Sequence, residues 1–197
     1  MALTSKLTAI ADAIRAKTGE TGKMTLEQMP GKIGGISGGG GGFDTSQITT
    51  TISMFESSEA QSIDISGLDV SNVHEMDRMF ALCSNIKSLD LSSFNVNEYM
   101  LQADGMFDGC TNLEVLDISS LGNLEQCDRF ISDCDSLSVI KIGKDSDTEP
   151  IFCYFKKDNE ASGYPEGFQI QVPAHLVDAY KADSSWADYV DQIVPRP

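Results

Sequence analysis

The sequence predicts an α/β repeat fold: a short solenoid with a C-terminal cap, preceded by an N-terminal helical segment. Three stretches, residues 78–94, 105–121 and 129–145, superimpose without a gap. In each stretch apolar residues alternate as in a strand, and the apolar residues before the strand have the spacing of a helix. A run of glycines, residues 38–42, separates these repeats from an amphipathic start.

Residues 1–33 are predicted to be a helical docking or oligomerisation segment. Leu3, Leu7, Ile10 and Ile14 recur at spacings of four, three and four, which places them on one helical stripe, as in a coiled-coil seam. So few apolar residues cannot enclose a core alone, so we expect the segment to pack on copies of itself or on a larger partner. The alternative is a helix that folds back on its own domain. Residues 34–42 are predicted to be a Gly-rich linker.

Residues 43–145 are predicted to hold the repeats. Their strand cores recur at offsets of 26, 27 and 24 residues, a period within the leucine-rich-repeat range. The four strand cores are Ile63/Ile65, Leu89/Leu91, Leu116/Ile118 and Ile140/Ile142. Before each strand, residues such as Val73, Met76, Met79 and Phe80 predict a helical turn. One unit cannot bury its apolar side alone, so we expect stacked units to share a core, in a leucine-rich-repeat-like solenoid.

Residues 146–197 are predicted to form a strand and a helical cap. Ile170 lies in the predicted strand, and Pro173 lies near the start of a helix. Trp186 and Tyr189 supply aromatic mass that could cover the last repeat. An aromatic ligand pocket is the alternative to a cap.

Composition and charge exclude several classes of partner. The chain of 197 residues has a net charge of −16, and residues 43–197 hold nine basic and 27 acidic residues. Such a surface repels phosphate backbones and anionic membranes, so no nucleic acid is expected as a partner. No apolar run approaches the roughly 20 residues of a membrane span, so no membrane insertion is expected. We see no secretory signal, which predicts synthesis in a cytoplasm.

The cysteines are predicted to be structural. The chain has five, an odd count, and no pair has the C-x-x-C spacing of a zinc site. Cys83, Cys110 and Cys134 occupy equivalent repeat positions, which suits small buried thiols at a tight corner. No catalytic residue, metal or cofactor is expected.

An outward row of polar residues follows the predicted strands. Asp64, Asp90 and Asp117 are equivalent and are followed by Lys141, and serines lie two residues after each aspartate. Asp–Ser pairs that fix the turn after the strand are the favoured interpretation, and a divalent cation between the stacked aspartates is the alternative. The candidate partner-binding surface consists of Gln61, Asp64, Lys87, Asp90, Glu114, Asp117 and Lys141.

Residues 78–94 and 105–121 each contain a Met-Phe step, a cysteine and the sequence Leu-Asp followed by Leu-Ser or Ile-Ser. This pattern resembles the BspA-like leucine-rich repeats of bacterial and phage surface proteins. Residues 129–145 depart from it, with Phe130-Ile131 at the Met-Phe step and Lys141 at the Asp. Residues 7–33 are similar to the start, and residues 172–195 to the end, of structural proteins from phages and prophages of Gram-positive bacteria.

The resemblance implies a non-enzymatic virion protein, of the tail, baseplate or a fibre, that is assembled in the host cytoplasm. Its partners would be other virion proteins and a host-surface protein or glycan, and the fibre analogy makes a homotrimer the first expectation. The alternative is a head or tail decoration protein with a purely architectural role. An enzyme that degrades cell wall would need paired carboxylates in a cleft or a Cys–His constellation.

Overall fold

The computed structural model describes residues 48–65, 67–96, 101–122, 124–151 and 165–197. The predicted N-terminal segment with Leu3, Leu7, Ile10 and Ile14, the Gly-rich linker and Cys153 lie outside the described residues. The domain boundaries proposed above therefore stay predictions.

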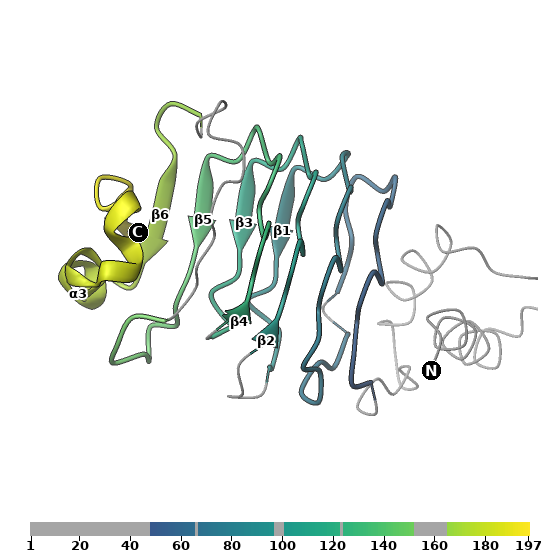
Figure 1. Ribbon diagram of the computed structural model, residues 1–197, viewed down its shortest axis with the longest axis horizontal. Coiled ribbons are helices and arrows are strands. Elements are labelled where there is room, and N and C mark those ends of the chain that lie inside the picture. Colours follow the sequence, from purple (N-terminus) through teal and green to yellow (C-terminus); the bar gives the residue numbers. More distant parts are fainter. Residues whose placement is uncertain (1–47, 66, 97–100, 123, 152–164) are drawn as a thin grey trace, which may run out of the picture.

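The described chain builds a parallel sheet from strands that lie one after another along the stack (Figure 1). The sheet has five strands, in the order β1 (Ser88–Asp90), β3 (Val115–Asp117), β5 (Val139–Lys141), β6 (Gln169–Val172) and β7 (Ile193–Pro195). A second ladder joins β2 (Leu101–Gln102) to β4 (Leu124–Gln126), also in parallel. The helices of the described residues are η1 (Ala174–Leu176), α3 (Val177–Ala182) and η2 (Ser184–Tyr189). The predicted α/β repeat-like fold is confirmed at this level.

The sheet register follows the predicted strand cores. Leu89 pairs with Leu116, which pairs with Ile140, and these three side chains are almost completely buried. The first predicted strand is wrong. Ile63 and Ile65 are buried in the same core, but the sheet ends at β1 and their segment joins neither ladder. Apolar alternation therefore indicated burial at these residues and not backbone pairing.

The predicted helical turns before the strands are also wrong: the chain forms pairs of β-turns there. In one pair, the Met79 N–H donates to the Met76 carbonyl (3.1 Å) and the Cys83 N–H to the Phe80 carbonyl (3.3 Å). Arg78 and Leu82, the third residues of these turns, have φ of 54° and 60°, the sign that a type II turn requires. Equivalent pairs of positive φ occur at Ser53/Ser57, Gly105/Gly109 and Arg129/Asp133.

Alternate N–H groups in these turns bond to the next repeat. The Met76 N–H donates to the Gln102 carbonyl (2.7 Å), and the Phe80 N–H donates to the Met106 carbonyl (2.9 Å). In an α-helix these N–H groups would bond four residues back within the same segment. In two successive four-residue turns, every fourth side chain lies on the same side of the repeat. The buried apolar residues of the turns are therefore spaced like those of a helix, which explains the wrong prediction. We call residues 51–58, 76–83, 103–110 and 127–134 the turn ladder.

A single hydrophobic core runs through the described residues, from Met54 to Ile193. Phe55 stacks on Phe80 (5.3 Å between ring centroids), Phe80 on Phe107 (5.6 Å), and Phe130 meets Phe107 edge-on (5.1 Å). Stacking one aromatic ring per repeat contributes about 0.5–1.5 kcal/mol per pair beyond area burial.

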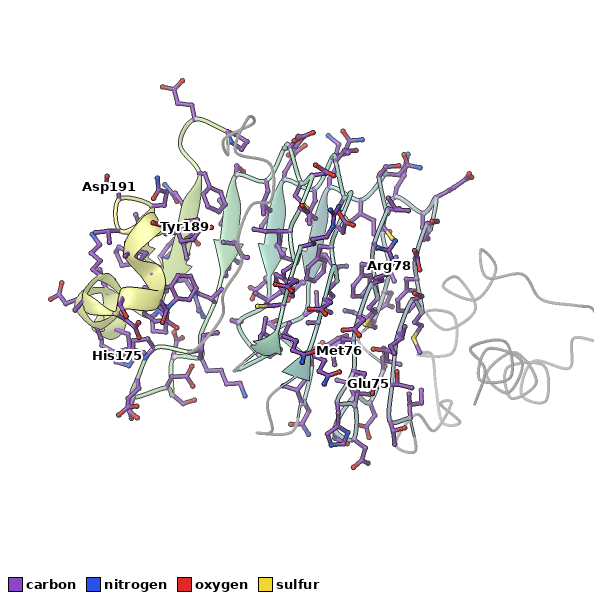
Figure 2. The ribbon with its side chains drawn as sticks, in the orientation of Figure 1. Glu75, Met76, Arg78, His175, Tyr189 and Asp191 are labelled. Carbon is purple, nitrogen blue, oxygen red and sulfur yellow. The ribbon has the colours of Figure 1, made fainter. Side chains whose placement is uncertain are left out.

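At the C-terminal end, Tyr180 and Trp186 are buried in this core and their rings meet at 5.4 Å. Tyr189, the last residue of η2, places its ring edge-on to Trp186 (6.4 Å between ring centroids; Figure 2). Pro173 precedes η1 as its N-cap, near the predicted helix start. No helix in the described part of the chain has the length and hydrophobicity needed to span a bilayer.

Candidate partner-binding face

Three of the predicted surface residues form one row across the sheet. Asp90 on β1 is opposite Asp117 on β3, which is opposite Lys141 on β5, because the parallel strands are in register. Gln171 on β6 continues the row beyond Lys141. We call this sheet surface, with Asp90, Asp117, Lys141 and Gln171 as its central row, the outer face.

The other predicted surface residues lie beside this row. Lys87 and Glu114 are exposed just before β1 and β3, and their side chains form an ion pair (3.1 Å). Gln61 and Asp64 are exposed too, in the segment that does not join the sheet. The structure thus brings five of the seven residues onto or next to β1, β3 and β5, and two onto the neighbouring segment.

The Asp–Ser interpretation is confirmed for two repeats. Asp90 accepts a hydrogen bond from the Ser92 N–H (2.8 Å), and Asp117 accepts from the Ser119 N–H (3.1 Å) and hydroxyl (2.7 Å). Hydrogen bonds from the Ser92 hydroxyl and N–H lower the pKa of Asp90, so this carboxylate stays ionised at neutral pH. Ser66, which would complete the pair with Asp64, lies outside the described residues.

The aspartate row is balanced in part by lysine. Lys141 contacts Asp117 (3.3 Å), as expected for a cation that offsets stacked carboxylates. In the described residues, no group of three or more His, Cys, Asp or Glu side chains is arranged to hold a metal ion. The alternative of a divalent cation between the aspartates therefore has no supporting geometry in that part of the chain.

A groove of about 400 Å³ opens on the outer face at the β1 edge. Its lining consists of Ser62, Ile63, Asp64, Ile65, Ser88, Leu89, Asp90, Ser92 and Ser93. Ile63, Ile65 and Leu89 are buried and form its floor, whereas the serines and aspartates are exposed where described. The groove therefore offers carboxylate and hydroxyl groups to a ligand and no basic side chain.

The repeated cysteines are structural, as predicted. The thiols of Cys83, Cys110 and Cys134 donate to the carbonyls of Phe55, Phe80 and Phe107 in the preceding repeat, each at 3.1 Å. Burial raises the pKa of Cys83 to about 12. The hydrogen bond with Cys134, followed by burial, raises the pKa of Cys110. Neutral buried thiols of this kind are poor nucleophiles.

Sequence reasoning missed a ladder of aspartates in the turns. Asp77 accepts a hydrogen bond from the Asp104 N–H, and Asp104 accepts from the Asp128 N–H, both at 2.9 Å. Burial raises the pKa of Asp77, and the charges of Asp104 and Glu75 raise it further. The three aspartates are equivalent in the repeat, but the alignment used above starts one residue after them.

An ion-pair network across the turns was also missed. Arg78 bonds Glu56 (2.6 Å) and reaches Asp108 (3.6 Å), and Arg129 reaches Asp108 from the next repeat (3.0 Å). Arg78 lies among the turns on the N-terminal side of the stack (Figure 2). Gly105, equivalent to Arg78 and Arg129, has φ of 58°, a backbone conformation that glycine adopts without strain.

Comparison with known families supports the repeat assignment. Residues 25–139 match the family described as Mycoplasma protein of unknown function, DUF285. The chain belongs to the DUF285 family. DUF285 is a BspA-like repeat family, which agrees with the resemblance seen in the repeats, and it assigns no activity. The DUF285 match covers the turn ladder and most of β1 to β5. No curated protein and no solved structure matches the chain.

Proposed function

We propose that the chain is a non-enzymatic structural protein of a phage virion, a tail, baseplate or fibre component that attaches to the host surface. In this proposal the described repeats form a leucine-rich-repeat-like solenoid, and the outer face contacts the host. The observation that carries it is the register of Asp90, Asp117, Lys141 and Gln171 across four parallel strands. Solenoids use such extended faces to bind partners.

The phage context rests on the sequence. Residues 7–33 and 172–195 are similar to the two ends of structural proteins from phages of Gram-positive bacteria, and the repeats between them are of a kind found on surface proteins. The predicted helical segment would join the protein to other virion proteins, and the linker would let the repeat domain face outward.

Adsorption to susceptible host cells tests the proposal. We expect purified protein to bind the cells and to reduce adsorption of the phage particles at least tenfold. A double variant, Asp90→Ala with Gln171→Ala, should lose this competition. Normal adsorption of particles that lack the protein, with no binding of the purified chain, would overturn host attachment. Antibody labelling of a capsid surface instead of the tail would then favour the decoration role.

A further inference from the structure

We propose that the ligand of the outer face is a polysaccharide chain without anionic groups. The inference rests on the proposed function and names the chemistry of the receptor. It follows from three properties of the outer face: its lack of apolar anchors, its periodic hydrogen-bonding groups and its charge.

The outer face lacks the side chains that anchor protein partners. Among the residues that the structure describes, Leu82 is the one large hydrophobic side chain that is exposed (48%), and it lies in the turn ladder, not on the sheet. Protein interfaces draw most of their binding energy from buried Trp, Tyr, Phe, Met and Arg. Val115, Val139 and Val194, which lie on the outer face in β3, β5 and β7, are small and half-buried. A protein ligand would find no anchor there.

The outer face instead repeats hydrogen-bonding groups. Asp90 and Asp117 accept, Lys141 donates, and the Gln171 amide does both. Adjacent strands are about 4.8 Å apart, so these groups recur at a constant interval along the stack. A polysaccharide presents hydroxyl groups, each a donor and an acceptor, along an extended chain. Its periodic hydroxyls therefore match the periodic side chains.

Charge restricts the polysaccharide to a neutral or amine-bearing one. Residues 43–197 carry 27 acidic and nine basic residues. The groove at the β1 edge adds Asp64 and Asp90 with serine hydroxyls and no basic side chain in its lining. A polymer of phosphate, sulfate or uronate groups would be repelled by this surface. Hydroxyl and ammonium groups would donate to the carboxylates.

Chemical treatment of cells that bind the protein tests the inference. Periodate cleaves the vicinal diols of sugars, whereas protease removes surface proteins. We expect periodate to reduce binding of the full-length protein at least tenfold and protease to reduce it less than twofold. The opposite pattern would overturn the inference and leave host attachment standing. If no susceptible cell binds the protein, both the inference and the proposed function fail.

A glycan array with matched variants tests the face itself. The full-length protein should bind neutral or amine-bearing oligosaccharides, and Asp90→Ala with Gln171→Ala should weaken binding at least tenfold. The control pair, Gln126→Ala with Asp128→Ala, changes the same residue types and the same charge at exposed positions on and beside β4, and should weaken binding less than twofold. Equal loss in both pairs, binding confined to anionic glycans, or no glycan binding would overturn the inference.

Discussion

At the scale of single residues, some positions of the fold have a positive φ that glycine adopts without strain. Gly143 has φ of 72°, and a Cβ there would lie 2.9 Å from the Tyr180 hydroxyl and 3.2 Å from Pro173 Cδ. Tyr180 is completely buried, and its hydroxyl accepts a hydrogen bond from the Ile151 N–H (3.1 Å). Because Tyr180 is buried and hydrogen-bonded, its hydroxyl cannot easily move away from a Cβ at residue 143. Gly122 has a similar φ of 67°, but no atom lies within 4 Å of its Cβ position. Alanine at residue 122 therefore measures the cost of the positive φ alone.

We expect Gly143→Ala to destabilise the fold more than Gly122→Ala. Left-handed backbone costs about 1–2 kcal/mol for alanine in either position. Overpacking against Tyr180 should add about 1–3 kcal/mol at Gly143 alone. Urea unfolding measures both, and in a Tyr180→Phe background the cost of Gly143→Ala should fall. An equal loss of unfolding free energy in the two variants would show that Tyr180 moves away from the added Cβ without cost.

The buried thiols predict a loss of stability at alkaline pH. The pKa of Cys83 is raised from 9.0 to about 12, so the stability tied to its neutral thiol is complete below pH 9. It is lost as pH rises from about 9 to 12, because the unfolded chain ionises first. Urea unfolding at pH 8, 9 and 10.5 should show this fall, and Cys83→Ala should reduce it.

Thiol reactivity provides an independent check. In a Cys153→Ser variant, which removes the cysteine outside the described residues, we expect the four remaining thiols to resist iodoacetamide at pH 8. All four should react in concentrated urea. Rapid alkylation of the folded variant would contradict the burial of the four thiols and the raised pKa of Cys83 and Cys110.

At the scale of elements, we expect Asp77 in the turn ladder and Asp90 on the outer face to affect stability in opposite ways as pH changes. Asp77 in the turn ladder has a raised pKa, so its stabilising contribution is present at acidic pH and is lost as pH rises through the folded-state pKa. Asp90 on the outer face has a lowered pKa, so its contribution is present at neutral pH and is lost as pH falls. The two pKa values shift in opposite directions because Asp77 is partly buried near other carboxylates, whereas Asp90 accepts hydrogen bonds from Ser92.

We expect Asp77→Asn to stabilise the protein at pH 7 and Asp90→Asn to destabilise it. The amide oxygen of the asparagine introduced by Asp77→Asn can still accept from the Asp104 N–H, so the substitution removes charge and keeps the bond. Both variants lose one negative charge, so each controls for the net charge of the other. Urea unfolding at pH 7 and pH 5 measures the effect. The same sign in both variants at pH 7 would mean that net charge outweighs local contacts.

The repeat alignment predicted part of the candidate site at this scale. Asp90, Asp117 and Lys141 could be placed in one row because their spacing follows the repeat period. Gln171 could not, because it lies 30 residues after Lys141 (171 − 141), beyond the offsets of 24 to 27 residues between the repeats. The ion-pair network was missed because it joins two different repeat positions, that of Glu56 and Asp108 and that of Arg78 and Arg129. Only the stacking of repeats brings these positions together.

At the scale of the whole molecule, we expect the predicted N-terminal stripe to set the oligomeric state. We expect the full-length protein to be a trimer by light scattering, and Leu7→Asp with Ile10→Asp to make it a monomer, because charges on the seam prevent packing. Thr8→Asp with Ala9→Asp adds the same charges away from the stripe and should keep the trimer. A monomeric parent protein would leave residues 1–33 as a docking segment only.

The sequence by itself determined the repeat, the buried positions and the register of β1, β3 and β5, because burial follows an apolar pattern that each repeat carries. Only the tertiary structure decided that residues 76–83 form turns and not a helix, and that the segment of Ile63 and Ile65 is not a strand. The physical reason is the same for both. Apolar spacing reports which side chains face the core, whereas in the turns of residues 76–83 alternate N–H groups bond to carbonyls 26 residues away on a neighbouring repeat, which apolar spacing does not show.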